Sequence, residues 1–198
     1  MPKISKTKQL QIVAHHEAGH AVVDLAFGRT PHSITIKPRG DTLGLCSGED
    51  NLIGDITNGD LEPMLVSLYA GRAAADHFAP EEAEANALGA SGDDEAAARL
   101  LRFWVGDTGQ AEIDCRARAA EIVRERWAAV EAIAAALLER TRIDGLEADL
   151  LADMAEGRIA PEQLADWRHF MGLPQSSRHR VPSGWVDIEF VAPDDGNA

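Results

Sequence analysis

Val13-Ala14-His15-His16-Glu17-Ala18-Gly19-His20-Ala21-Val22 is the stretch that decides both the fold and the chemistry expected of this 198-residue chain. Residues 16–20 form an HExxH run. Apolar residues recur around the run at steps of three and four, which predicts an amphipathic helix over about residues 8–27. Gly28, with a proline close behind it, supplies the stop signal for that helix.

The spacing of the run is suited to binding a metal. Residues four apart lie on the same face of a helix, so His16 and His20 can direct their imidazole nitrogens at one point. A Zn²⁺ ion about 2.0–2.1 Å from each nitrogen satisfies this geometry. Glu17 can reach the water that the cation activates without binding the cation, and can take its proton. The run therefore predicts zinc ligands at His16 and His20 and a general base at Glu17.

Two further observations favour this interpretation over chance. An accidental HExxH in a chain of this composition has a probability of roughly 2 %. Gly19 lies in the middle of the predicted helix, where glycine costs about 1 kcal/mol relative to alanine. We therefore expect another part of the chain to approach the backbone closely at this position.

A catalytic zinc takes three protein ligands, and the sequence leaves the third one open. Metzincins place a ligand six residues after the second histidine, where this chain has Ala26, so that class is excluded. Thermolysin-like enzymes use a glutamate from a following helix, but the next glutamate, Glu49, lies in a glycine-rich stretch with no helical pattern. The remaining candidates are the acidic residues of the segment 91–95, where a helix dipole would favour a carboxylate in the first turn.

The overall composition narrows the class of protein. The net charge is −14 and the sequence pI about 4.8, which argues against binding to nucleic acids or anionic membranes. The two cysteines, Cys46 and Cys115, form no CxxC pair and predict no disulfide framework. We find no transmembrane stretch, secretory signal or P-loop motif, and expect a cytoplasmic protein.

Patterning along the chain predicts an α+β fold that is predominantly helical, with a short edge strand or hairpin near the N-terminus. The expected elements are strands at 33–37 and 42–45, a loop at 46–59, a helix at 60–78, a loop at 79–92, helices at about 93–106, 110–140, 146–156 and 161–171, and a strand at 185–190.

Several segments, in the same order, resemble the zinc peptidase domain of the FtsH-type ATP-dependent proteases. Residues 14–22 match the HEAGHAV helix of that family, and Ile34-Thr35-Ile36-Lys37-Pro38-Arg39-Gly40 is similar to its strand-and-turn segment. Ala70-Gly71-Arg72-Ala73-Ala74 matches its GGRAAE helix, and Gly89-Ala90-Ser91-Gly92-Asp93 resembles its GASND segment. The resemblance covers roughly residues 10–155.

The resemblance implies a third zinc ligand, because the aspartate of GASND completes the site in that family. By position this residue is Asp93, with Asp94 as the fallback if the register differs by one residue. The resemblance also implies a peptidase domain over residues 1–157, followed by a C-terminal extension over 158–198 whose role is unknown. Ile34–Lys37 is the expected edge strand, against which an extended substrate would pair.

We therefore expect a zinc-dependent metalloendopeptidase that hydrolyses peptides or unfolded proteins. The family's ATPase module and membrane helices are not matched, so its substrates would need to arrive unfolded or be delivered by a partner. One alternative is a non-catalytic zinc-binding adaptor that binds proteins. Another is the peptidase subunit of a split complex with a separate ATPase. The oligomeric state is left open.

Overall fold

The structure is a computed structural model that describes residues 4–38, 44–47, 58–104 and 106–173. The chain divides into two compact units, residues 1–164 and 165–198. Helix α8 (Pro161–Phe170) spans the boundary, and the first unit holds every other helix and strand of the described ranges. The predominantly helical α+β fold expected from the sequence is confirmed.

Helix α1 (Lys6–Ala26) carries the HExxH run and agrees with the predicted helix to within two residues at each end. It begins at Ser5, whose hydroxyl oxygen accepts a hydrogen bond from the backbone N–H of Lys8 at 3.2 Å. It ends before Gly28, whose positive φ of 72° is a conformation that glycine adopts at little cost.

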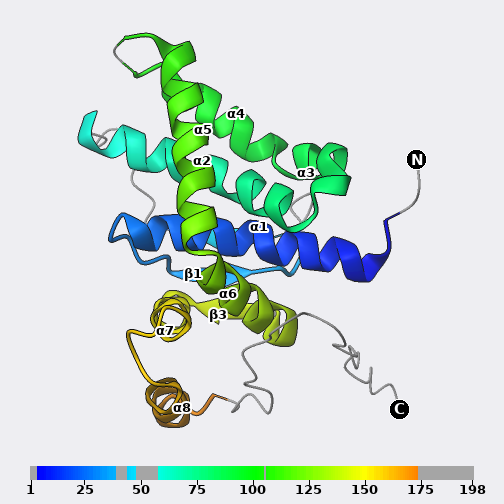
Figure 1. Ribbon diagram of the computed structural model, residues 1–198, viewed down its shortest axis with the longest axis vertical. Helices are drawn as coiled ribbons and strands as arrows, with labels where there is room; N and C mark the ends of the chain where they lie inside the picture. Colours follow the sequence, from blue (N-terminus) through cyan, green and yellow to red (C-terminus); the bar gives the residue numbers. More distant parts are fainter. Residues whose placement is uncertain (1–3, 39–43, 48–57, 105, 174–198) are drawn as a thin grey trace. The chain divides into compact units, whose positions relative to one another are not determined.

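Helix α2 (Asn58–Phe78) packs along α1, and α5 (Thr108–Glu125) crosses them both (Figure 1). Gly19 explains how α1 and α2 come so close together. A Cβ atom at this position would lie 2.6 Å from both the carbonyl oxygen of Ala70 and the Cβ of Ala74. The close approach expected from a glycine inside the helix is thus confirmed, and α2 is the neighbour.

A small antiparallel sheet contains β1 (Ser33–Thr35), β2 (Leu45–Ser47) and β3 (Arg142–Asp144) in the order β2-β1-β3. The hairpin near the N-terminus is confirmed as the β1–β2 pair. The described return strand begins at Leu45, later than predicted, and residues 42 and 43 lie outside the described residues. Cys46, which was expected in a loop, lies in β2.

The prediction that residues 34–37 form an edge strand is wrong. Ile34 pairs with Cys46 on one side and with Ile143 on the other, so β1 is the central strand. The sequence did not indicate β3, because three residues are too few to establish an alternating pattern. Among the described residues, β2 and β3 are the edges of the sheet.

The single long helix predicted over 110–140 is two helices, α5 and α6 (Trp127–Arg140). They are separated at Arg126, which has φ −105° and ψ 27°. Its guanidinium donates to the Glu156 carboxylate at 2.6 and 3.1 Å and to the Val22 carbonyl oxygen at 3.1 Å. These contacts connect the break to α1 and to the segment that follows α7.

The prediction of a loop over the segment 79–92 is also wrong. It contains a 3₁₀ turn (Pro80–Glu82) and α3 (Ala83–Gly89), and it leads into α4 (Ser91–Leu101). The alanines of this segment favour a helix despite its acidic composition, and Pro80 suits the first position of the turn. Helix α4 therefore begins two residues before the predicted start at about 93.

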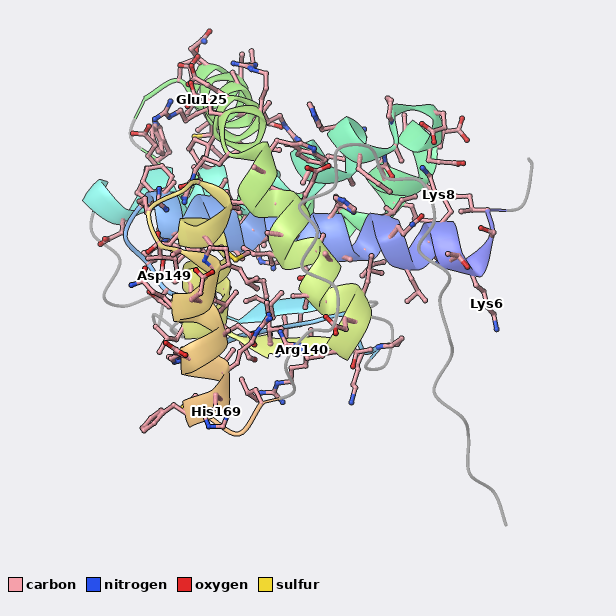
Figure 2. All side chains as sticks on the ribbon, turned by 60° about the horizontal axis from the view of Figure 1, so that its bottom comes forward. Lys6, Lys8, Glu125, Arg140, Asp149 and His169 are labelled. Atoms are coloured by element: carbon pink, nitrogen blue, oxygen red, sulfur yellow. The ribbon has the colours of Figure 1, made fainter. Side chains whose placement is uncertain are left out.

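Helix α4 ends at Leu101, earlier than predicted, whereas α2, α7 and α8 agree with prediction to within two residues. Helix α7 (Gly145–Ala155) begins after Asp144, whose carboxylate accepts a hydrogen bond from the backbone N–H of Glu147 at 2.8 Å. The Glu147 carboxylate is buried and pairs with Arg140, which lies at the end of α6 (Figure 2). The strand predicted at 185–190 lies outside the described residues.

The hydrophobic core lies where α1, α2, α5 and α6 meet. Its side chains are mostly small, with alanines at many of the fully buried positions, which permits close approach of the helices. Within the part of the chain that the structure describes, no helix combines the length and the apolar character needed to cross a bilayer.

Candidate metal centre

The two histidines of the HExxH run face each other across one turn of α1. The Nε2 atoms of His16 and His20 lie 3.1 Å apart, and their ring planes are inclined at 74°. Both side chains are largely buried, with 12 % and 11 % of their surface exposed. The i, i+4 spacing thus gives the convergence of nitrogens that the sequence predicted.

A carboxylate from α4 meets this pair. Asp93 Oδ2 lies 3.0 Å from His16 Nε2 and 3.4 Å from His20 Nε2, although Asp93 is 77 residues beyond His16 in the chain. One possible ligand atom from each of the three residues lies within 4.8 Å of the others. Over the described ranges, this is the one group of three or more His, Cys, Asp and Glu side chains close enough to hold an ion.

A carbonyl group of α2 fixes the orientation of one imidazole. His20 Nδ1 lies 2.7 Å from the Ser67 carbonyl oxygen, which can only accept a hydrogen bond, so Nδ1 carries a proton. Nε2 is then the atom presented to His16 and Asp93. Metal-binding histidines use such a bond to fix their tautomer and orientation.

Gly71 on α2 provides the space beside the Nε2 atoms of the two histidines. A Cβ atom at this position would lie 2.4 Å from His20 Nε2 and 2.5 Å from His16 Nε2. Two imidazoles and one carboxylate, with a fourth position left for water, are a donor set typical of catalytic zinc. The residues present therefore fit a zinc ion.

Glu17 lies beside this cluster and is 5 % exposed. Its side chain packs against Gly44, where a Cβ atom would lie 2.4 Å from Glu17 Oε1, and its carboxylate accepts a hydrogen bond from the backbone N–H of Cys46. Burial raises the pKa of the Glu17 carboxyl to about 7, against the opposing influence of His20. A pKa near neutrality suits a group that accepts and returns a proton.

The charges of the other three side chains are coupled. Burial lowers the pKa of His20, but its bond to Asp93 and the charges of Asp93 and Glu17 outweigh this and raise it to about 9. Burial also lowers the pKa of His16, and at this residue burial outweighs the hydrogen bond and charge of Asp93, which would raise the pKa. Burial opposes ionisation of Asp93, yet hydrogen bonds from both histidines hold its pKa well below the ordinary range. Without a cation, the cluster is therefore a His20–Asp93 ion pair beside a neutral His16.

The other candidates for a third ligand do not join the cluster. Asp94 binds a different residue: its Oδ1 accepts a hydrogen bond from Arg116 Nη2 on α5 at 2.9 Å. Glu95 is exposed, and Glu49 lies outside the described residues.

His15, the residue before the HExxH run, is buried and stacks on Phe78 with ring centroids 3.8 Å apart. Its Nδ1 bonds the Gln11 carbonyl oxygen at 2.7 Å, which keeps this ring within the packing between α1 and α2.

Sequence reasoning did not assign a role to Ser67, Gly44 or Gly71. Ser67 acts through its backbone carbonyl, so no side-chain pattern could have indicated it. Gly71 did carry a signal, since it lies in the Ala70–Ala74 motif, but its contact with the imidazoles depends on how α1 and α2 cross.

Comparison with known proteins places the cluster inside a recognised family. The sequence model of peptidase family M41 matches residues 3–113, which include His16, Glu17, His20 and Asp93. The chain is also similar to curated proteins named ATP-dependent zinc metalloprotease FtsH. The relative from Haemophilus influenzae is 40 % identical over 113 residues, which cover 55 % of this chain and 17 % of the relative.

Two further relatives show similar coverage. The protein of that name from Streptococcus pneumoniae serotype 4 is 34 % identical over 117 residues, covering 56 % of this chain and 17 % of the relative. FtsH 1 from Thermoanaerobacter sp. is 34 % identical over 117 residues, covering 56 % and 18 %. The chain thus spans less than a fifth of the length of these relatives.

Proposed function

Because the chain belongs to peptidase family M41, we propose that it is a zinc-dependent metalloendopeptidase. In this proposal His16, His20 and Asp93 hold the ion, and Glu17 is the general base. The observation that carries the proposal is the convergence of His16, His20 and Asp93 from α1 and α4, two helices that are far apart in the sequence. The buried carboxylate of Glu17 lies beside them. A site that only stabilises the fold does not need such a carboxylate.

When bound, the zinc ion supplies a Lewis acid that makes water nucleophilic near neutral pH. Glu17 accepts a proton from the water that attacks the peptide carbonyl, and the new carbon–oxygen bond forms as this proton leaves. Glu17 then gives the proton to the leaving amine nitrogen as the carbon–nitrogen bond breaks. The backbone N–H of Cys46 holds the carboxylate in place through both transfers.

We place the substrate along β2. This strand is an edge of the sheet in the described residues, and its Cys46 binds the general base, so a chain that pairs with β2 passes close to Glu17. Pairing through main-chain hydrogen bonds requires an extended substrate and tolerates many side chains. Peptides and unfolded proteins meet this requirement.

A peptidase domain over residues 1–157 is part of the proposal, because α1, β2, α2 and α4 carry the proposed catalytic residues and the groups that bind them. The relatives are named as ATP-dependent, and a separate ATPase that delivers unfolded chains to this domain is part of the proposal. A protein that acts on its own would cleave only substrates that are already unfolded.

Substitution of the general base tests the mechanism. Glu17→Gln removes the proton acceptor and leaves all three ligands in place, so zinc content should remain at the wild-type level. Cleavage of an unfolded protein should fall by at least about a hundredfold, the lower range of a general base's contribution. Both are measured on purified protein loaded with zinc.

Glu95→Gln is the matched control, because Glu95 is an exposed residue of α4 outside the cluster, and it should cleave like the wild type. Equal cleavage by the Glu17→Gln variant and the wild type would contradict the mechanism. Zinc binding without cleavage in the wild type would favour the non-catalytic adaptor instead.

A further inference from the structure

Helix α4 delivers Asp93 to the cluster, yet little apolar packing fixes its rotation. Within α4 only Ala97 and Leu101 are buried, and the first residue of the helix receives no side-chain cap. Side-chain atoms lie about 6 Å from a helix axis, so a rotation of about 20° would move the carboxylate by about 2 Å. Metal ligands must be placed to within a few tenths of an ångström, so something must hold this helix in register.

An arginine from a neighbouring helix provides such a hold. Arg116 on α5 donates from Nη2 to Asp94 Oδ1 at 2.9 Å, one residue beyond the proposed ligand. Successive residues lie about 100° apart around a helix, so Asp93 and Asp94 extend in different directions from the same turn. Fixing Asp94 therefore fixes the angle at which Asp93 is presented.

Arg116 is itself held from two sides. Its Nε donates to Glu112 Oε1 at 2.9 Å on α5, and its guanidinium carbon lies 4.1 Å from the ring centroid of Tyr69 on α2. Tyr69 is buried and lies two residues before Gly71, whose backbone faces the ligand nitrogens. The guanidinium thus connects the first turn of α4 to α2, the same helix that supports the two imidazoles.

We propose that Arg116 is a positioning residue for the metal centre, which holds Asp94 so that Asp93 reaches His16 and His20. This inference rests on the proposed function, because it assumes that Asp93 binds zinc. It differs from a general contribution to stability. Arg116 and Asp94 are 40 % and 36 % exposed, and ion pairs with such exposure contribute little to folding.

The direction of the effect separates positioning from simple electrostatics. Arg116→Gln removes a positive charge near a cation site, and electrostatics alone would then make zinc bind more tightly. Loss of positioning makes zinc bind more weakly, by about tenfold, the lower range for groups that support metal ligands. The melting temperature of the metal-free protein should change by at most about 3 °C.

The experiment measures the zinc dissociation constant by competition with a chromogenic chelator. Arg118→Gln is the matched control, because Arg118 is an exposed arginine of the same helix that pairs with Glu121, and it should bind zinc like the wild type. Asp94→Asn should weaken binding as much as Arg116→Gln, and the double variant should be no weaker than either single one.

Unchanged or tighter zinc binding by Arg116→Gln would overturn the inference and leave the proposed function standing. Weakening that appears equally in Arg118→Gln would also overturn it, because the effect would then belong to charge on α5 in general. A wild-type protein that binds no zinc would overturn the proposed function and this inference with it.

Discussion

His20 is the residue on which the charge state of the centre depends. Its bond to Asp93 keeps it protonated in the metal-free protein at neutral pH, since its pKa is raised to about 9. Burial keeps the neighbouring His16 neutral by lowering its pKa. The ion pair between His20 and Asp93 therefore occupies the space that a cation would take, and the cation must replace one proton.

Zinc binding should release about one proton at pH 7. A zinc ligand must be a neutral imidazole, so the proton of His20 has to leave. The raised pKa of His20 sets the pH window: apparent affinity should rise about tenfold per pH unit between pH 7 and about 9, and level off above that. Calorimetry in buffers of different ionisation enthalpy measures the released proton. A binding enthalpy independent of the buffer would contradict this charge assignment.

The residues of the cluster differ in how far the sequence could predict them. The convergence of His16 and His20 follows from helical spacing alone. The partner of those histidines could not follow from spacing, because Asp93 and Asp94 are adjacent and both lie in the first turn of α4. Only the positions of Arg116 and the two imidazoles separate the roles of these aspartates in the structure.

At the scale of elements, the crossing of α1 and α2 creates the space in which a metal fits. Gly19 on α1 allows the helices to approach, and Gly71 on α2 leaves room beside the Nε2 atoms of His16 and His20. Alanine would favour a helix more than glycine does at both positions. Each glycine therefore indicates a close contact that a side chain would obstruct.

Gly71→Ala should weaken zinc binding by more than about tenfold. The added methyl group would lie 2.4 Å from His20 Nε2 and would push the imidazoles aside. Gly92→Ala is the matched control, because it adds the same group to a helix next to Asp93 with no atom within 4 Å. Alanine favours a helix at both positions, so loss of helix stability cannot account for a difference. Equal zinc affinities of the two variants would show that the space beside Gly71 is not needed.

Strand β2 leads to a prediction about substrates. A test peptide carries methyl groups on the backbone nitrogens that flank the cleaved bond, while the nitrogen of that bond is unmodified. Such a peptide cannot donate the hydrogen bonds of strand pairing. Each lost bond is worth about 1 kcal/mol, so KM should rise about fivefold per bond with little change in kcat. Steady-state kinetics measure this, with a peptide methylated at its distal end as the control. An unchanged KM would exclude pairing with β2.

The elements that sequence patterns missed were decided by contacts distant in the chain. Nothing in the alanine-rich run from 110 to 140 indicates a break, and Arg126 lies at one because Glu156 and the Val22 carbonyl bind its side chain. Strand β3 exists because β1 pairs with it. By contrast, α1, α2 and α7 were predictable because their own periodicity and end signals define them.

At the scale of the whole molecule, the centre is assembled from segments that are far apart in the sequence. Helix α1 supplies two imidazoles and the proposed base, and α4 supplies the carboxylate. Helix α2 supplies Gly71 and the Ser67 carbonyl, and β2 supplies the amide that binds Glu17. Zinc affinity therefore reports on the tertiary structure of the first unit as well as on individual ligands.

Comparing the zinc affinity of Asp93→Asn with that of Asp94→Asn tests whether His16, His20 and Asp93 hold the ion. The two variants remove the same charge from adjacent residues of α4, but Asp93→Asn removes the carboxylate that faces His16 and Asp94→Asn removes the one that binds Arg116. We expect Asp93→Asn to weaken zinc binding by more than about a hundredfold, and Asp94→Asn by only about tenfold. Equal losses, or a larger loss in Asp94→Asn, would contradict the assignment of Asp93 as the third ligand.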